Sequence, residues 1–523
     1  MRELPVLDVT APSPSRGRAA PAAGSRVAEF VTDDVVMPRF HVWTLGCQMN
    51  HSDSEEMAGS LLAAGCSEAP DLATADLVVI NSCAIREAAE QKVIGRMGVL
   101  QRLKDGNPRM RVVLTGCSVR ADNGPELHRR YPAIDLFLRP DEEPELTARL
   151  GLAGATSPGA LAAKGMGLLP MSRAAAVAHG SVARGSAVSA WLPVIYGCDK
   201  TCTYCIVPFS RGPERSRPFD DVLAEARALA DSGVREVTLL GQNVNSYGHD
   251  LPVEPRFAGV DGTRTLGRAL DLVGRPDFAA LLRAIDGIRT SDGVPRIPRL
   301  RFVTSHPWDL TDRLIGAMAE CPSVCEHLHL PVQSGDDGVL RRMGRQYTID
   351  AYLRLVERLR AAIPGIALTT DVICGFSGEG DAAFEATLEL LRQVRFDQVF
   401  AAAFSVRPGT PAARLPDDVL PAEKRGRLNA LLELQEGIGL ERNEAWVGRT
   451  TQVLVEVVRE PRSHAHEPTE GEAVADATGT RVAGRNRQHK LVHLDGSADD
   501  VGRLVSVMIE RAGPYALSGR RLD

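Results

Sequence analysis

A short loop with three cysteines contains the residues of this chain best suited to metal chemistry. Cys198, Cys202 and Cys205 follow directly after an apolar, strand-like run. Thiolates bind soft metals, and iron–sulfur clusters are usually held by four of them. A cubane cluster held by these three would keep one iron open to a ligand from outside the protein. The alternatives are a zinc site with a distant fourth ligand or a set of buried thiols, and we favour the cluster.

A second set of three cysteines is spread along the first part of the chain. Cys47, Cys83 and Cys117 each follow an apolar run of strand character, and a helical stretch follows each cysteine in turn. Ligands gather at the carboxyl ends of parallel strands in open α/β sheets. We therefore expect the three thiols to meet at one rim and to hold a second cluster. The alternative is that each cysteine is a small buried hydrophobe.

Alternating strands and helices must position both sets, so the fold class is α/β. The first region should form a parallel sheet. In the second region, six strand–helix units predict a partial (β/α)6 barrel. After Gly448 the pattern changes to short alternating strands, which predict a small β-barrel. The six expected barrel strands lie near residues 190–195, 236–240, 300–303, 327–330, 367–372 and 398–404.

The chain of 523 residues is too long for one hydrophobic core and suggests roughly three domains. Composition shifts place the boundaries. The expected divisions are a disordered arm at 1–38, a cysteine domain at 39–150, a linker at 151–187, the barrel core at 188–445 and the β-barrel at 446–515.

The composition is ordinary for a soluble globular protein, with 44% hydrophobic and 24% charged residues. The net charge of −6 means that any surface for nucleic acid must be a local patch. The sequence shows neither a long apolar run nor a secretory signal, so we expect a cytoplasmic protein without a membrane contact. In a reducing compartment, grouped cysteines favour metal binding or catalysis over disulfides.

Polar residues after the barrel strands are candidates for contacts with a bound cofactor. Gln242 and Asn243 follow one strand and could donate amide hydrogen bonds, although capping of the next helix is an equal alternative. Asp371 is expected at the end of another strand. The CxxxCxxC loop, with Tyr204 before its last cysteine, resembles the radical S-adenosylmethionine (SAM) superfamily. The resemblance implies that SAM binds the open iron and yields a 5′-deoxyadenosyl radical, with Tyr204, Gln242, Asn243 and Asp371 near the cofactor.

Both cysteine sets together are similar to the radical methylthiotransferases, and the similarity extends over nearly all of 39–520. One branch of that family modifies N6-dimethylallyladenosine in tRNA and typically has the sequence GCQMN, as at 46–50 here. Further matches to this branch are the segments 81–87, 304–307, 327–335 and 407–413.

The resemblance implies an enzyme that methylthiolates C2 of N6-dimethylallyl (isopentenyl) adenosine 37, with two SAM molecules and two [4Fe-4S] clusters. It also implies that tRNA binds through its anticodon stem-loop. A flavodoxin- or ferredoxin-type protein is the expected electron donor, and the enzyme is expected to be a monomer. Other branches modify threonylcarbamoyl-adenosine in tRNA or a ribosomal protein, and both remain alternatives. A non-catalytic iron–sulfur RNA-binding protein is the alternative from another class.

Two basic segments are candidates for phosphate contacts. The first lies in the β module, which resembles the small RNA-binding TRAM domain, and contains Arg485, Arg487 and Lys490; a solvated hairpin is the alternative. The second follows the radical loop and contains Arg211, Arg215 and Arg217, which could equally pair with carboxylates. The other four cysteines, Cys66, Cys321, Cys325 and Cys374, are expected to be structural thiols, although the spacing of Cys321 and Cys325 could suggest a third site.

Overall fold

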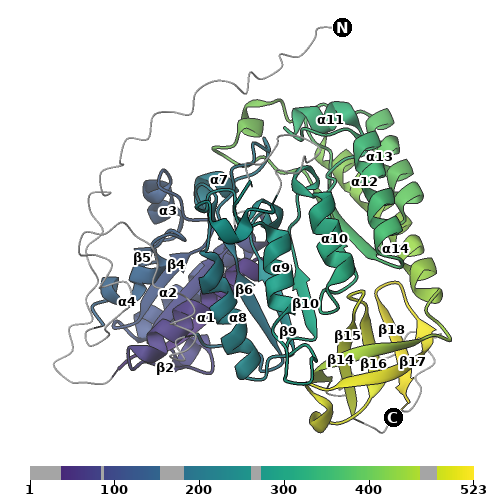
Figure 1. Ribbon diagram of the computed structural model, residues 1–523. Helices are drawn as coiled ribbons and strands as arrows, with labels where there is room; N and C mark the ends of the chain where they lie inside the picture. The colour runs from purple at the N-terminus through teal and green to yellow at the C-terminus, as the bar shows by residue number, and fades with distance from the viewer. Residues whose placement is uncertain (1–36, 84–86, 153–181, 261–272, 460–479, 523) are drawn as a thin grey trace, which may run out of the picture.

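The computed structural model describes residues 37–83, 87–152, 182–260, 273–459 and 480–522. The expected arm at 1–38 and the linker at 151–187 lie almost entirely outside these ranges. Two α/β units and a β-barrel follow one another along the chain, from the purple sheet to the yellow barrel in Figure 1. No helix in the described part of the chain is long and apolar enough to cross a bilayer.

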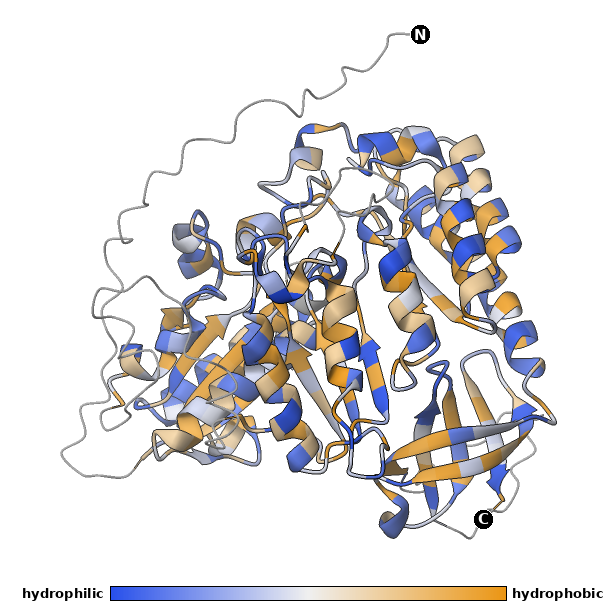
Figure 2. Cartoon of the chain, in the orientation of Figure 1, coloured by the Kyte–Doolittle hydropathy of each residue, from blue (hydrophilic) through white to orange (hydrophobic). Residues whose placement is uncertain are grey.

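The first unit is a five-stranded parallel sheet with the order β2-β1-β3-β4-β5. Its central strands are fully buried and rich in Val, Ile and Leu, as expected for a sheet covered on both faces. Figure 2 shows these apolar strands in orange. The elements are β1 (Arg39–Leu45), α1 (Gln48–Ala63), β2 (Ser67–Glu68), β3 (Leu77–Ser82), α2 (Glu87–Gly106), β4 (Arg111–Thr115), α3 (Gly124–Arg130), β5 (Leu136–Phe137) and α4 (Leu146–Arg149).

The second unit is the predicted partial barrel, and all six expected strands are present. They form two parallel three-stranded sheets, β6-β9-β10 and β11-β12-β13, joined by a bridge between Leu300 and Val324. The strands are β6 (Ser189–Pro193), β9 (Glu236–Leu240), β10 (Arg299–Phe302), β11 (His327–His329), β12 (Ala367–Cys374) and β13 (Gln398–Ala403). The helices are α8 (Phe219–Asp231), α9 (Phe278–Asp286), α10 (Asp312–Glu320), α11 (Asp337–Arg342), α12 (Ile349–Ala362), α13 (Asp381–Val394) and α14 (Pro421–Glu444).

Side chains alternate between the two faces of each barrel strand. Leu368 and Val372 of β12 and Val399 of β13 join the hydrophobic core with the covering helices. The residues at the alternate positions, among them Asp371 of β12 and Phe400 of β13, therefore face the inside of the half-barrel. A short ribbon of β7 (Ile195–Tyr196) and β8 (Arg215–Ser216), with α7 (Val207–Ser210) between them, frames the cysteine loop at the carboxyl end of β6.

The third unit is a closed five-stranded barrel with the order β14-β15-β16-β18-β17, which confirms the predicted β module. Two strands were not predicted, β15 and β18, because each contains glycine and arginine and neither shows a regular alternation of apolar and polar residues. The strands are β14 (Thr450–Arg459), β15 (Arg481–Asn486), β16 (Leu491–Asp495), β17 (Leu504–Ala512) and β18 (Ala516–Arg521).

Candidate active site between two cysteine sets

The three dispersed cysteines lie at the carboxyl ends of neighbouring strands. In the sheet register, Leu45 of β1 pairs with Ser82 of β3, and Asn81 pairs with Thr115 of β4. Cys47, Cys83 and Cys117 each follow within two residues of these positions. The structure therefore brings the three residues to one rim, as the strand pattern predicted.

Two buried amides fix the chain around Cys47. Helix α1 begins directly after this cysteine, earlier than the sequence indicated, and Cys47 is its N-cap residue. The Asn50 side-chain oxygen accepts a hydrogen bond from the Cys47 backbone N–H at 3.3 Å, and its Nδ2 donates to Asn81 Oδ1 at 2.7 Å. Asn81 in turn donates to the Asn50 carbonyl at 2.9 Å. The turn at Cys47 is thus tied to β3 just before Cys83.

Gly116 allows the third cysteine to approach the other strands. Its φ of +89° lies in the left-handed region, and a Cβ there would be 2.3 Å from the Ser82 carbonyl oxygen. Only glycine fits both the conformation and the close approach. Cys117 is buried, and burial raises the pKa of its thiol, with further contributions from charges that include Cys47.

The second cysteine loop is anchored on both sides by backbone hydrogen bonds. Cys198 N donates to the Gly212 carbonyl at 3.1 Å, and Thr203 N donates to the Met343 carbonyl at 2.9 Å. Gly197 has a φ of +72°, and a Cβ there would lie 2.1 Å from the Pro213 carbonyl oxygen. These contacts hold the three thiols on one compact loop.

Burial disfavours free thiolates on this loop. Burial, followed by the charge of Cys202, raises the pKa of the Cys205 thiol to about 12. Burial and Glu214 raise the pKa of Cys198 as well. Thiolates in this position therefore need a bound cation, and a soft, positively charged iron cluster meets that requirement. The donor set fits such a group.

Arg211 joins the two cysteine sets. Its Nε lies 3.2 Å from Cys117 Sγ, and its NH2 group donates to Asp53 of α1 at 2.6 Å. Asp53 and Arg211 are both almost completely buried. Burial and the charge of Asp53 raise the pKa of the adjacent Glu143 well above its usual value, which favours its neutral form. Helix α1 also packs against β6, so the cysteine domain covers that edge of the half-barrel.

A second arginine contacts the radical loop. Arg345 NH1 lies 3.6 Å from Cys202 Sγ, and its other nitrogens donate to Tyr347 Oη at 3.0 Å and to the Pro331 carbonyl at 2.6 Å. Tyr204 of the loop packs edge-on against Phe376. Each cysteine set thus receives one buried guanidinium from elsewhere in the chain.

Asn243 belongs to a buried polar cluster beside the loop. Its Nδ2 donates to Asp309 at 2.5 Å, and its Oδ1 accepts from the His306 backbone N–H at 3.2 Å. Lys200 of the loop pairs with the same Asp309 at 2.5 Å. Asn243 is therefore engaged within the protein, whereas Gln242 beside it is half-buried. Burial, then Arg345 and Lys200, lower the pKa of His306, so its imidazole is neutral.

Asp371 lies on the inner face of the half-barrel, within β12 and not at its end. It is the cross-strand neighbour of Phe400 on β13. The His329 ring packs edge-on against Phe400 with 5.7 Å between centroids, and its Nε2 lies 3.4 Å from Asp371 Oδ2. Two residues further along β12, Ile373 packs in the cluster that includes Tyr204. The side chains of Asp371, His329 and Phe400 therefore lie just below the cysteine loop, and Phe400 is 47% exposed.

The structure pairs the cations of the basic run with carboxylates, and the role of this run in phosphate binding stays a prediction. Arg487 forms an ion pair with Glu326 at 2.7 Å, and Lys490 forms one with Asp397 at 2.7 Å, both across the contact between barrel and core. Arg485 pairs with Glu456 at 2.6 Å. Arg487 and Lys490 thus hold the β-barrel against the amino ends of β11 and β13, whereas the Arg485 pair lies within the barrel. Their partners are remote in sequence, which the local run could not show.

The second basic segment is also largely internal. Arg211 is buried as described above, and Arg217 is buried between Asp221 and Glu225. The structure thus shows carboxylate pairing, the alternative considered from the sequence, for Arg211 and Arg217. Arg215 is exposed. The roles of Arg211, Arg345 and Lys200 were missed, since only the fold brings their partners near.

The other four cysteines are buried thiols. Cys66, Cys321 and Cys374 lie in hydrophobic clusters, and Cys325 is buried beside Ser323. Burial raises the pKa of Cys66 to about 11 and that of Cys374 to about 12. They are structural thiols, as expected.

Comparisons with known proteins define the class first. Residues 192–391 match the Radical SAM superfamily, and residues 39–139 match an uncharacterized protein family, UPF0004. Among solved structures, the radical SAM methyltransferase TsrM from Kitasatospora setae is 14% identical with a TM-score of 0.47, covering 72% of this chain and 74% of that one. The family match places residues 192–391 in the radical SAM class.

Curated relatives narrow the class to one family. The tRNA-2-methylthio-N(6)-dimethylallyladenosine synthase of Carboxydothermus hydrogenoformans is 41% identical, over 92% of this chain and 98% of that protein. The protein of the same name from Sorangium cellulosum is 40% identical, over 92% and 93%. The chain belongs to the tRNA-2-methylthio-N(6)-dimethylallyladenosine synthase family. It is therefore a transferase whose cofactors are SAM and iron–sulfur clusters.

Proposed function

We propose that this chain methylthiolates C2 of N6-dimethylallyladenosine 37 in tRNA. The observation that carries the proposal is the presence of two three-cysteine sites in adjoining domains, where Arg211, six residues after the second site, contacts Cys117 of the first. One site suits radical formation, and the adjacent site suits storage of the group to be transferred. The names of the curated relatives supply the substrate.

The six cysteines are proposed as cluster ligands. Cys198, Cys202 and Cys205 would hold a [4Fe-4S] cluster that binds SAM, and Cys47, Cys83 and Cys117 would hold the auxiliary one. With these groups bound, the site supplies a 5′-deoxyadenosyl radical and a methylated sulfur. Such chemistry is required because an unactivated aromatic C–H bond is beyond the reach of side-chain acids and bases.

The chain's own residues position the reactants. Gln242 is half-buried, and we propose that its amide contacts SAM. Asn243 binds Asp309 and the His306 backbone, and Asp309 also pairs with Lys200 of the loop. Tyr204 packs under the loop. Asp371, His329 and Phe400 form the inner wall of the half-barrel just below the loop, where the target base would enter. Loop bases of RNA can be splayed out in this way.

The alternatives are less well supported. Methylthiolation of threonylcarbamoyl-adenosine or of a ribosomal protein is disfavoured by the names of the relatives. A non-catalytic iron–sulfur protein would not need a second complete cysteine set in contact with the first. A flavodoxin- or ferredoxin-type reductant, a monomeric state and a cytoplasmic location belong to the same proposal.

Nucleoside mass spectrometry of tRNA tests the function. A strain that lacks the gene should contain N6-dimethylallyladenosine without the methylthio group, and the wild-type gene should restore that group. A Cys83→Ala gene is the matched control and should not restore it. Retention of the methylthio group in the deletion strain would contradict the proposal.

A further inference from the structure

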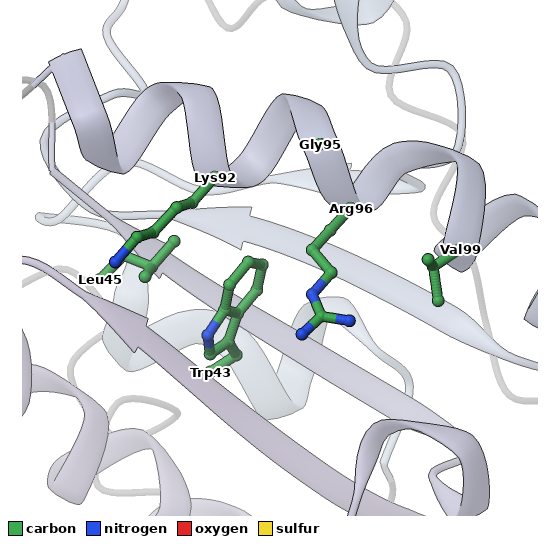
Figure 3. Close-up of a pocket in the computed structure, with 6 residues that line it drawn as sticks. All are labelled: Trp43, Leu45, Lys92, Gly95, Arg96 and Val99. Carbon is green, nitrogen blue, oxygen red and sulfur yellow. The ribbon is translucent and has the colours of Figure 1, made fainter. Parts of the chain in front are cut away.

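A groove on the cysteine domain contains an aromatic ring between two cations. Its volume is about 460 Å³, and it lies between strand β1 and helix α2 (Figure 3). Trp43 and Leu45 line it from β1; Lys92, Gly95, Arg96 and Val99 line it from α2. The helical residues are spaced at i, i+3, i+4 and i+7, so they share one face of α2.

The charges in this groove differ from those of the basic run in the β-barrel. Lys92 and Arg96 are exposed, and among the described residues neither has a carboxylate partner. The Arg96 guanidinium lies over the Trp43 ring, 5.7 Å from its centroid. Arg487 and Lys490, by contrast, are already neutralised by Glu326 and Asp397. Cations that have no carboxylate partner in the described part of the chain, beside a partly exposed ring, suit a ligand with both phosphate and aromatic parts.

Gly95 keeps the groove open. No atom lies within 4 Å of the position that a Cβ would occupy there. Glycine in a helix interior lowers helix stability by roughly 1 kcal/mol relative to alanine. At position 95 this loss is accompanied by open space in the groove. The groove also lies close to the proposed reaction site, because Trp43 of β1 is four residues before Cys47, which follows the end of that strand.

We propose that this groove binds a nucleotide of the tRNA anticodon stem-loop, with the base stacked on Trp43 and the phosphates on Lys92 and Arg96. Aromatic platforms combined with basic grooves are the usual means of holding single-stranded nucleic acid without reading its sequence. The inference rests on the proposed function, since it assigns part of the tRNA contact of that same enzyme.

Binding of a fluorescent anticodon stem-loop RNA to the reconstituted enzyme tests the inference. Trp43→Ala should raise Kd by roughly 5- to 150-fold, the range measured for loss of one base–aromatic stack. Trp43→Phe, which keeps a ring, should recover most of the affinity. The double variant Lys92→Ala/Arg96→Ala should weaken binding and make the salt dependence shallower, by about one counterion for each lost phosphate contact.

Gly95→Leu provides a variant that fills the groove and removes no side chain. It should raise Kd, whereas Gly98→Leu, at an exposed glycine of the same helix that does not line the groove, should not. Both variants should keep their iron content and their cleavage of SAM to 5′-deoxyadenosine. Unchanged Kd and unchanged salt dependence in the Trp43, Gly95 and Lys92/Arg96 variants would overturn the inference. If the wild-type enzyme modified no tRNA at all, the proposed function would fail instead.

Discussion

Removal of Arg211 should loosen the contact between the cysteine domain and the barrel core. The Arg211–Asp53 pair has an N–O distance of 2.6 Å, and side-chain exposures of 4% and 6%. At an effective dielectric constant of 20, charges 4 Å apart attract each other by about 4 kcal/mol. Breaking a buried pair by removing one partner typically costs about 3–5 kcal/mol, because the other charge stays buried. For Arg211→Met we therefore expect a loss of about 3 kcal/mol or more.

Hydrogen exchange of the amides in α1 measures this opening locally, which is appropriate for a protein of several domains. Arg354→Met is the control, because Arg354 and Asp350 form an exposed pair on one helix and should contribute only about 0.3–0.5 kcal/mol. The double variant Asp53→Asn/Arg211→Met should lose less than the sum of the two single losses, since both charges leave together. Equal effects of Arg211→Met and Arg354→Met, or simple additivity in the double variant, would refute the reasoning.

Three further outcomes are expected. Cys198→Ala should abolish 5′-deoxyadenosine formation, whereas Cys83→Ala should retain some cleavage of SAM but no methylthio transfer. Equal loss of both activities in the two variants would contradict separate roles for the two cysteine sets. Phe400→Ala should lower kcat/KM for stem-loop RNA by about 10-fold or more through lost base contact, and Phe400→Leu by less; equal values for wild type and Phe400→Ala would exclude this wall from the base site. Burial lowers the pKa of His489 and of its stacked partner His327, the latter to about 3. Both pKa values lie below the unfolded value of about 6.5, so as the pH drops protons bind the unfolded state first. The free energy of unfolding should therefore fall between about pH 6.5 and pH 3. The slope should be at most about 1.4 kcal/mol per pH unit for each histidine. His489→Asn should reduce that slope in acid denaturation, and an unchanged slope would argue against it.

The sequence was sufficient for the architecture of the site. The apolar runs before Cys47, Cys83 and Cys117 are strands of one parallel sheet, so their carboxyl ends had to share a rim. The loop at Cys198 follows β6 as expected. Both inferences depend on local pattern and on a general rule of α/β sheets, and neither requires knowledge of distant contacts.

The partners of the arginines were beyond the reach of local pattern. Arg487 and Lys490 form a basic run in the sequence, but their carboxylate partners lie just before strands β11 and β13, more than ninety residues away. Arg211 was considered for phosphate because it follows the cysteine loop, yet it is buried, pairs with Asp53 and donates a hydrogen bond to Cys117. Similarly, β15 and β18 lack an apolar alternation, and they are recognised as strands only by their pairing with neighbours in the closed barrel.

The most direct test of the two-site account is nucleoside mass spectrometry on tRNA treated in vitro with the reconstituted enzyme, SAM and a reductant. The account predicts a methylthio group on N6-dimethylallyladenosine with the wild type, and 5′-deoxyadenosine without that product for Cys83→Ala. Formation of the methylthiolated nucleoside by Cys83→Ala would contradict it.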